Sequence, residues 1–211
     1  MGAPDDESID PEDEEAVRER FWRGVRARHP HFRHAVLADA RLTLARRDEP
    51  SELRTPVEAI VQVLRLMLVT DAFAAQVMYR LKARLQALGV PILPWFAHHA
   101  AMVLAGVSIG DPVVVEAGVY LPHGRVVIDG IAEVHRDVTI APWVTVGRIQ
   151  HEVRGPVIGR DVRIGTGAKL LGPITIGDRA TVGANSVVVD DVEPGTTVVG
   201  APARPVDDRA R

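Results

Sequence analysis

The 211-residue sequence contains no cysteine. That absence excludes a disulfide framework, an iron–sulfur cluster, a zinc site with Cys ligands and a cysteine nucleophile. Long apolar runs are missing too, because charged residues, prolines and a histidine pair interrupt the stretches 59–78 and 90–109. The first residues are acidic and do not resemble a signal peptide. We predict a soluble, cytoplasmic protein that binds no membrane.

The chain also lacks an excess of charge of either sign, since its formal net charge is −3. This balance argues against a nucleic-acid partner whose phosphates a basic surface would follow. The one strongly biased segment is residues 1–15, which hold eight acidic side chains and no basic one. Like charges repel along such a run, so we predict an acidic disordered tail or a ragged helix start over residues 1–15. Residues 207–211 are assigned as a C-terminal tail.

Residues 16–105 are predicted to form a helical N-terminal domain. The histidines around Pro30 indicate a break between two helices rather than a metal site, because His29, His31 and His34 lack a firm ligand spacing. Residues 57–88 give the clearest helical pattern, and Gly89 is a suitable C-terminal stop. Apolar residues recur there every three or four positions, at Ile60, Leu64, Met67, Ala74, Met78, Leu81, Leu85 and Leu88.

A six-residue repeat dominates the sequence from Gly106 onward, where 15 of the 18 glycines lie. The repeat has one extra residue after Leu121 and one vacant position at Glu152. Each hexad is expected to supply one short strand and a turn, stacking one aliphatic side chain into a continuous core. We therefore predict a β-helical solenoid over residues 106–206. Its aliphatic positions are Ile109, Val115, Leu121, Ile128, Val134, Ile140, Val146, Ile158, Ile164, Leu170, Ile176, Val182 and Val188.

The repeat resembles the left-handed parallel β-helix of hexapeptide-repeat acyltransferases, and its details are most similar to serine O-acetyltransferases. The resemblance covers about residues 57–206. It is carried by Gly106-Val107-Ser108-Ile109, Tyr120-Leu121-Pro122-His123-Gly124, the stretch 164–172, the stretch 182–188 and the closing Val199-Gly200-Ala201-Pro202-Ala203-Arg204. It implies an α+β fold, with an N-terminal α-helical segment followed by a left-handed parallel β-helix.

The resemblance also implies acetyl transfer from acetyl-CoA to a small-molecule hydroxyl acceptor, as in cysteine biosynthesis. Active sites are expected between the subunits of a homotrimer, which helices can join into a dimer of trimers. His123 stands where the family keeps its general base, a role that suits a group titrating near neutrality. Arg154 matches the arginine that binds the substrate carboxylate, and a guanidinium fork suits that contact.

The positions that match the family's CoA-binding residues are mostly small. Gly147, Gly167, Ala168 and Ala184 would let the thin pantetheine chain lie against the prism, while Arg204 matches a basic residue near the nucleotide phosphates.

Two departures from the family's pattern concern the acceptor. Ser108 stands fifteen residues before His123, where serine acetyltransferases place an aspartate that orients the imidazole. Gly155 stands where a further active-site histidine is expected, and we consider His151 a substrate-binding substitute. Asp129 and Glu152 are alternative orienting groups for His123.

Other functions remain open on these residues. The altered loop would also fit a sugar or a specialised metabolite as acceptor, and the missing aspartate and histidine would fit a non-catalytic β-helix scaffold. A zinc enzyme on the same prism needs three imidazoles around one metal. His123, His135 and His151 lack the closely spaced pair of such enzymes, so we expect no metal.

Overall fold

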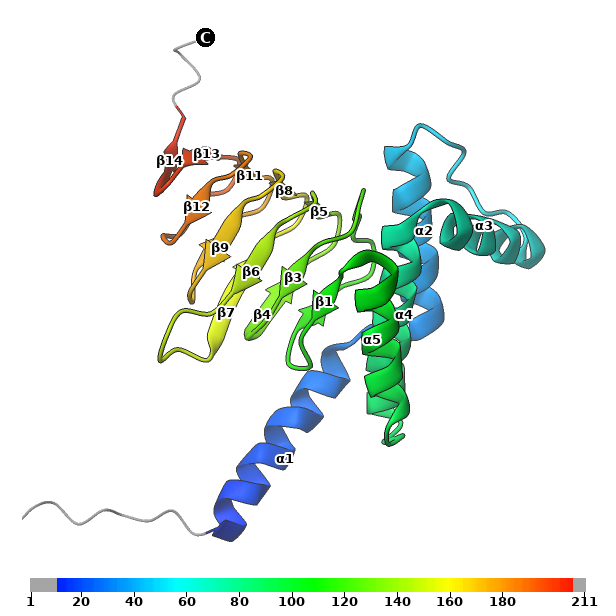
Figure 1. The fold of residues 1–211 in the computed structure, drawn as a ribbon, viewed down its shortest axis with the longest axis horizontal. Coiled ribbons are helices and arrows are strands. Elements are labelled where there is room, and N and C mark those ends of the chain that lie inside the picture. The colour runs from blue at the N-terminus through cyan, green and yellow to red at the C-terminus, as the bar shows by residue number, and fades with distance from the viewer. Residues whose placement is uncertain (1–10, 207–211) are drawn as a thin grey trace, which may run out of the picture.

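The computed structural model describes residues 11–206, in which five helices precede a β-helical prism (Figure 1). The predicted α+β fold class is confirmed. No helix in the described range is long and apolar enough to cross a membrane. The helices are α1 (Pro11–Arg28), α2 (Phe32–Arg46), α3 (Pro56–Val69), α4 (Asp71–Ala87) and α5 (Leu93–Ala105).

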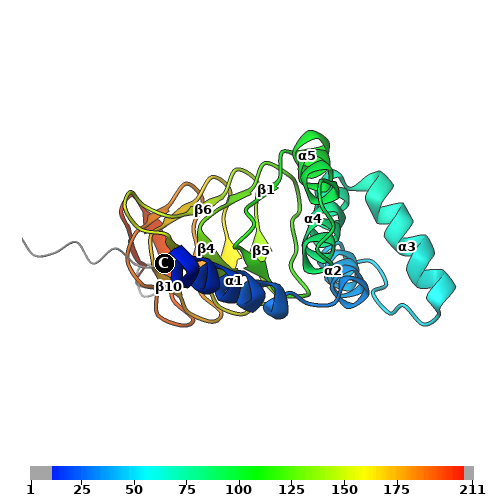
Figure 2. The same ribbon diagram turned by 90° about the horizontal axis from the view of Figure 1, so that it is seen from below.

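The first helix corrects one boundary of the sequence analysis. Helix α1 begins at Pro11, a favourable residue for a first helical position, so residues 11–15 are helical rather than part of a disordered tail. Residues 1–10 and the predicted tail 207–211 lie outside the described residues. The predicted break around Pro30 is confirmed, and α1 extends beneath the prism, where Arg28 pairs with Glu133 (Figure 2).

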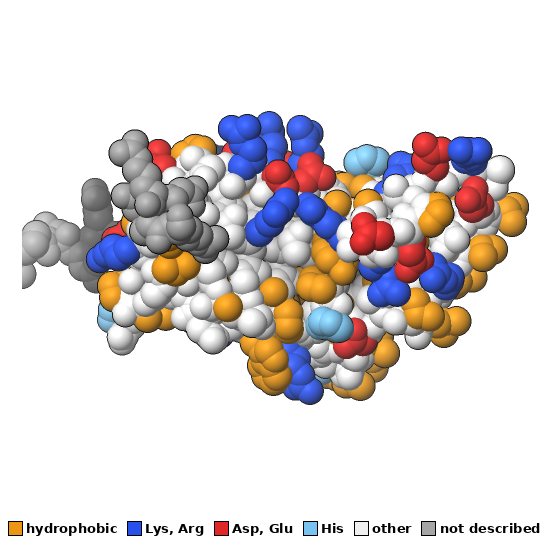
Figure 3. Space-filling view, turned by 90° about the horizontal axis from the view of Figure 1, so that it is seen from above, with side chains coloured by type: hydrophobic (Ala, Val, Ile, Leu, Met, Phe, Trp, Pro, Cys, Tyr) orange, Lys and Arg blue, Asp and Glu red, His pale blue; other side chains and the backbone are white. Residues whose placement is uncertain are grey.

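The apolar segment 57–88 is two helices rather than one. Thr70 is extended, with φ −137° and ψ 104°, and Asp71 begins α4 with an acidic residue in the first turn. Of the residues on the predicted apolar stripe in α3, Ile60 and Leu64 are exposed, whereas Leu66, which is not on that stripe, is buried. Together with Val57, Val61, Leu68 and Val69 they form an exposed apolar face of α3 at the helical end of the molecule, on its right in Figure 3.

The prism has three sheets of parallel strands, apart from the antiparallel β14. The first sheet is β1 (Ser108–Ile109), β3 (Val127–Ile128), β6 (Thr145–Gly147), β9 (Lys169–Leu171) and β12 (Val187–Val188). The second is β2 (Val114–Val115), β4 (Ile131–Val134), β7 (Arg154–Ile158) and β10 (Thr175–Ile176). The third is β5 (Thr139–Ile140), β8 (Arg163–Ile164), β11 (Thr181–Val182), β13 (Thr197–Gly200) and β14 (Ala203–Pro205).

The core of the prism confirms the repeat. All thirteen predicted aliphatic positions are buried in one continuous cluster. A second inward row lies two residues earlier in most hexads, since side chains alternate along a strand. Its members are also buried and include Val107, Val113, Val119, Val126, Ala132, Val138, Val144, Val162, Ala168, Ile174 and Ala180.

Helix α4 covers the N-terminal end of the prism and places a buried ion pair there. The Arg80 Nε and Nη2 atoms lie 2.9 and 3.1 Å from the Asp39 carboxylate of α2. The same guanidinium donates to the carbonyls of Val115 at 2.6 Å and Glu116 at 2.7 Å. Both side chains are almost fully buried, so every charge-assisted bond here replaces water.

The Asp39 carboxylate also accepts hydrogen bonds from the first rung. One oxygen lies 2.9 Å from the Gly118 nitrogen and 3.0 Å from that of Val119. Gln76 of α4 donates to the Val119 carbonyl at 2.8 Å. These contacts satisfy backbone groups that have no preceding rung to bond.

The side chains of α2 and α4 that bond the first rung form a cap on the prism, and two further α4 side chains complete it. Lys82 donates to the Ile109 carbonyl at 2.6 Å and to the Asp111 carboxylate at 2.9 Å. The Tyr79 hydroxyl donates to the Val113 carbonyl at 3.1 Å, and burial raises the Tyr79 pKa to about 12. Polar side chains of one helix thereby fix the first rung, on which the later rungs of the prism stack.

His29, at the end of α1, gives this cap a pH-dependent neighbour. Burial lowers the pKa of His29 to about 4, with a further contribution from the positive charges of Arg80, Lys82 and Arg28. Because the folded state holds the imidazole neutral, the unfolded state binds the extra proton once the pH falls below the usual value near 6.5. The free energy of unfolding is therefore insensitive to His29 above pH 6.5, and it falls as the pH drops from 6.5 toward 4.

We therefore expect a His29→Gln variant to lose less stability than wild type between pH 7.5 and 5.5. The difference should be about 1 kcal/mol, allowing for the partial exposure of the ring. Urea unfolding at the two pH values measures it. His34→Gln, on the exposed side of α2, is the control and should behave as wild type. Equal pH slopes in wild type and His29→Gln would contradict the assignment.

Candidate active site

The turns between the three sheets form three corners of the prism, and His123 lies on one of them. This His123 corner joins the third sheet to the first and comprises residues 122–126, 141–144, 165–168 and 183–186. A second corner joins the first sheet to the second and contains the loop 148–153. Because corners stack from rung to rung, residues far apart in sequence lie side by side along each edge.

The His123 turn is held against the C-terminal end of α5. The Arg125 nitrogen donates to the Ala105 carbonyl at 2.7 Å. A methyl group added at Gly124 would lie 1.9 Å from that carbonyl oxygen, so only glycine permits this approach. Gly106 ends α5 in the left-handed conformation, with φ +63°, and its Cα faces the Arg125 side chain. The C-terminal end of α5 therefore fixes the position of the turn that carries His123.

A cavity of about 490 Å³ opens beside His123. Its walls are the last turn of α5, the His123 turn and the corner of the next rung, with one acidic residue from the start of α4. The lining residues are Asp71, Met102, Val103, Leu104, Ala105, Gly106, His123, Gly124, Arg125, Pro142 and Trp143. The exposed imidazole can meet a ligand there, and over residues 11–206 its ring makes no hydrogen bond.

None of the proposed orienting groups lies in this cavity. Ser108 lines a separate cavity of about 560 Å³ beside the N-terminal half of α5, together with His98, Asp111 and Asp129. Asp129 pairs instead with Arg148 at 3.9 Å. The structure therefore does not bring Ser108 or Asp129 to His123 in the way that the family's aspartate is expected to act.

Arg154 and His151 belong to the second corner, away from the His123 cavity of the same chain. Arg154 is exposed, and its Nη2 atom lies 3.3 Å from the Glu152 carboxylate. Hydrogen bonds from the Arg154 backbone and side chain lower the pKa of Glu152, which stays ionised and compensates the guanidinium. His151 is exposed at φ +66° in the preceding turn. Within one protomer, the predicted base and the predicted substrate-binding residues are not neighbours.

The predicted CoA-binding positions are divided. Gly167 and the exposed Ala184 lie on the His123 corner, on successive rungs beyond the cavity. Ala168 is fully buried in the core, so it presents no side-chain surface to a ligand. Gly147 is buried at the end of β6, but a methyl group added there would meet no atom within 4 Å. Arg204 pairs with Asp190 at 2.8 Å near the far end of the prism.

Three cavity residues were missed by the sequence analysis: Asp71, Arg125 and Trp143. The last two are eighteen residues apart, which is one full turn of three hexads, and that spacing was a usable signal. The three histidines weighed as zinc ligands fall on three different corners, since His135 pairs with Glu116 at the third. Across residues 11–206 no three potential ligands cluster as a metal site would require.

Comparisons with known proteins agree with this architecture. Residues 155–190 match the family described as bacterial transferase hexapeptide (six repeats), and residues 100–122 match the hexapeptide repeat of succinyl-transferase. The stacked rungs, the three sheets and these matches define a hexapeptide-repeat protein of the left-handed β-helix class.

Within that class, the chain belongs to the serine acetyltransferase family. It is 34% identical to the soybean serine acetyltransferase apoenzyme, with a TM-score of 0.69 over 84% of this chain and 69% of that one. The Neisseria gonorrhoeae serine acetyltransferase in complex with serine is 29% identical, with a TM-score of 0.70 over 88% of this chain and 73% of that chain.

A Mycobacterium tuberculosis serine acetyltransferase is 43% identical over 119 residues, which are 55% of this chain and 52% of that protein. The Escherichia coli enzyme is 33% identical over 173 residues, or 81% of this chain and 63% of that one. The chain thus spans about half to two thirds of the length of the curated relatives it matches.

The contact between Gly124 and α5 gives a stability prediction. Gly124→Ala should lower the free energy of unfolding by about 1–3 kcal/mol, because the new methyl group forces a backbone carbonyl to move. Urea unfolding measures the effect. Gly24→Ala in α1 is the control: no atom lies within 4 Å of the added methyl group, and it should stabilise the helix by about 0.5–1 kcal/mol. Unchanged stability of Gly124→Ala would contradict the clamp.

Proposed function

We propose that the protein is an acetyl-CoA-dependent O-acyltransferase, most like serine O-acetyltransferase, which transfers the acetyl group to a small hydroxyl acceptor. The observation that carries this proposal is the His123 cavity. An exposed imidazole stands at its edge, on a turn fixed by α5, and the half-buried Gly167 and the exposed Ala184 follow on the next rungs of the same corner. An acceptor can enter the cavity while a thin acyl donor lies along the corner.

In the proposed reaction, His123 takes the proton of the acceptor hydroxyl as the oxygen attacks the thioester carbonyl carbon. Backbone N–H groups along the His123 corner are assigned to stabilise the negative charge on the tetrahedral oxygen. The carbon–sulfur bond then breaks, and the imidazolium returns its proton to the leaving CoA sulfur. Proton and electron pairs balance without a covalent enzyme intermediate, in keeping with a chain that lacks cysteine.

Gly167 and Ala184 are proposed to border the path of the donor's pantetheine chain, because both are accessible small positions on this corner. Arg204 is proposed to lie near the nucleotide phosphates. The side chain of Ala168 is buried, so any contact there would have to involve backbone atoms, whereas the space beside the Gly147 Cα is open.

We propose a homotrimer, since Arg154 and His151 can meet an imidazole only across a subunit boundary. In that arrangement the second corner of one protomer faces the His123 corner of its neighbour, and the site is completed by two chains. The exposed apolar face of α3 supports a further association of two trimers. A cytoplasmic location is part of the same proposal.

Replacing His123 tests the activity most simply. His123→Ala should lower kcat by about 10²- to 10⁴-fold, the usual contribution of a general base. The measurement is release of free thiol from acetyl-CoA with L-serine, homoserine and a panel of sugars and amino alcohols. His34→Ala, an exposed histidine on α2, is the matched control and should retain wild-type turnover.

The acceptor that supports turnover also separates the alternatives. A sugar in place of an amino acid would redefine the substrate. If wild type neither binds acetyl-CoA nor releases thiol, the acyltransferase proposal fails and the β-helix is a scaffold.

A further inference from the structure

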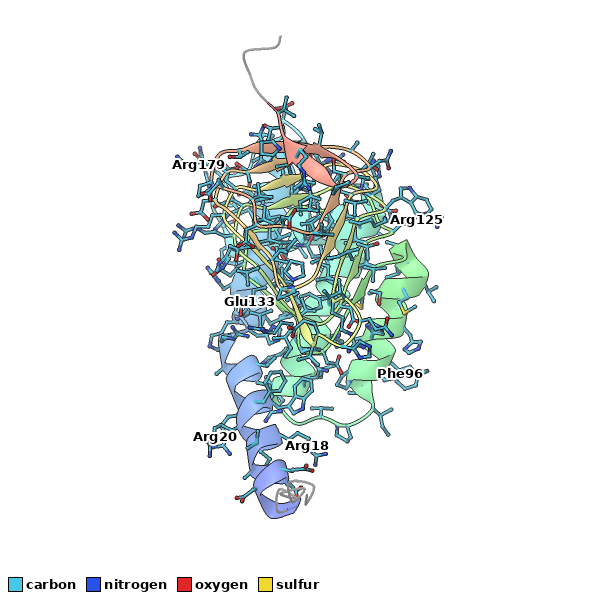
Figure 4. The ribbon with its side chains drawn as sticks, turned by 90° about the vertical axis from the view of Figure 1, so that its left-hand side faces the viewer. Arg18, Arg20, Phe96, Arg125, Glu133 and Arg179 are labelled. Atoms are coloured by element: carbon cyan, nitrogen blue, oxygen red, sulfur yellow. The ribbon has the colours of Figure 1, made fainter. Side chains whose placement is uncertain are left out.

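The cavity beside the N-terminal half of α5 can hold a ligand that the proposed reaction does not use. Its volume of about 560 Å³ is in the range of small-molecule sites. Figure 4 separates it from the His123 cavity, because Phe96 lies toward the lower end of α5 and Arg125 lies at the upper end. We call this cavity the α5 cleft, and its lining includes Lys82, Trp95, His98, Asp111, Val127 and Asp129.

The carboxylate of Asp129 is held in the α5 cleft from two directions. Asp129 directly follows β3, and its nitrogen donates to the Val146 carbonyl at 2.9 Å. A methyl group added at Gly110 would lie 2.9 Å from the Asp129 Oδ1 atom, so the carboxylate occupies space that a side chain at position 110 would need. Glycine on the first rung therefore allows Asp129 to lie against that rung at the edge of the cleft.

The charges of the α5 cleft leave this carboxylate uncompensated. Lys82 and Asp111 neutralise each other, with the Lys82 Nζ atom 2.9 Å from the Asp111 carboxylate. Burial lowers the pKa of His98, with a further contribution from the positive charge of Lys82, so the imidazole is neutral at physiological pH. Among the described residues, the cation within 4 Å of Asp129 is Arg148, at 3.9 Å, and both side chains are more than half exposed. Such a pair contributes little and can give way to a better-placed cation.

An aromatic side chain lines the same cleft. The Trp95 ring lies 3.8 Å from the ring of His99 and 4.9 Å from that of Phe96, measured between centroids. These contacts hold the indole in place, although Trp95 remains 55% exposed. Val127 adds apolar surface from β3. An indole attracts a cation to its face and also packs against hydrocarbon, so this wall suits a cation with an apolar body.

The remaining polar groups of the cleft are neutral. His98 follows Trp95 by three residues on α5, and over residues 11–206 its ring makes no hydrogen bond. A neutral imidazole offers one donor and one acceptor, and Ser108 adds a hydroxyl group. With Asp129 as the uncompensated charge, these groups accept the hydrogen bonds of an ammonium group, whereas an anion would be repelled.

We propose that the α5 cleft binds a small organic amine, whose ammonium group lies on the Asp129 carboxylate and whose apolar body packs against Trp95 and Val127. The site is separate from the His123 cavity and goes beyond the acyltransferase activity. A bound amine connects the two parts of the molecule, because Trp95 and His98 belong to α5 while Asp129 belongs to the prism.

Three phenyl compounds of similar shape test the charge preference: 2-phenylethylamine, 2-phenylethanol and phenylacetate. Calorimetric titration of the full chain should give a dissociation constant about 10-fold or more lower for the amine than for the alcohol, the effect of one charged hydrogen bond. Phenylacetate should not bind. Equal affinity for the amine and the alcohol, or no saturable binding of the amine, would overturn the proposal.

Variants of the cleft test the assigned contacts. Asp129→Asn should raise the dissociation constant of 2-phenylethylamine by about 10- to 100-fold. Gly110→Ala, which displaces the carboxylate, should change it in the same direction. Trp95→Ala should raise it by about 3- to 10-fold, because the cation loses its aromatic contact. Wild-type affinity in Asp129→Asn contradicts the assignment.

Two matched controls lie outside the α5 cleft. Glu193→Gln removes an exposed carboxylate at the third corner, and Trp143→Ala removes an indole from the His123 cavity. Both variants should bind 2-phenylethylamine as wild type does. Loss of binding in Trp143→Ala would place the amine in the His123 cavity and overturn the proposal.

Competition and hydrogen exchange locate the bound amine. L-serine should not displace 2-phenylethylamine, and the amine should slow amide exchange over residues 95–99 and 127–130 while leaving 141–144 unchanged. Displacement by L-serine, or protection confined to residues 122–126 and 141–144, would show that the amine occupies the acceptor site instead. These measurements do not depend on turnover, so they stand apart from the test of the acyltransferase activity.

Discussion

The ion pair between Arg80 and Asp39 is the contact on which the rest of the molecule depends. A β-helix has an open end whose first rung lacks a preceding rung to bond, and here that end faces α4. The pair neutralises two buried charges and satisfies carbonyl and N–H groups of the first rung at once. Removing one partner would leave the other charge buried, at a cost of about 3–5 kcal/mol. The helices therefore act as the missing first layer of the prism.

This cap also explains where the His123 cavity lies. Helix α5 packs against α4, and its last carbonyls meet the His123 turn at Gly124. The His123 imidazole, Arg125, Trp143 and Asp71 thus line one cavity at the junction of the helical domain and the prism. In the proposed function, the corner of the following rungs holds the long acyl donor. In the proposed trimer, the second corner, with Arg154, faces a neighbouring chain.

Periodicity predicted the prism well because every rung repeats the same demand for an inward aliphatic side chain. It also placed His123 on a turn. It failed where contacts join distant segments: Arg80 and Asp39 are 41 residues apart, and no pattern of apolar spacing reveals a buried polar pair. The break at Thr70 was hidden inside an apolar run. Arg125 and Trp143 become neighbours only when the rung length of eighteen residues is applied to the corners rather than to the core.

Hydrogen exchange of wild type and Asp39→Asn tests the central claim, that the cap positions the site. We predict faster exchange of the first-rung amides 113–119 together with those of the turn 122–126 and the end of α5, while rungs 163–188 keep their wild-type protection. Coupled loss at the rung and the turn would show that one buried carboxylate holds both in place. Faster exchange limited to residues 113–119, with the His123 turn unchanged, would contradict the account.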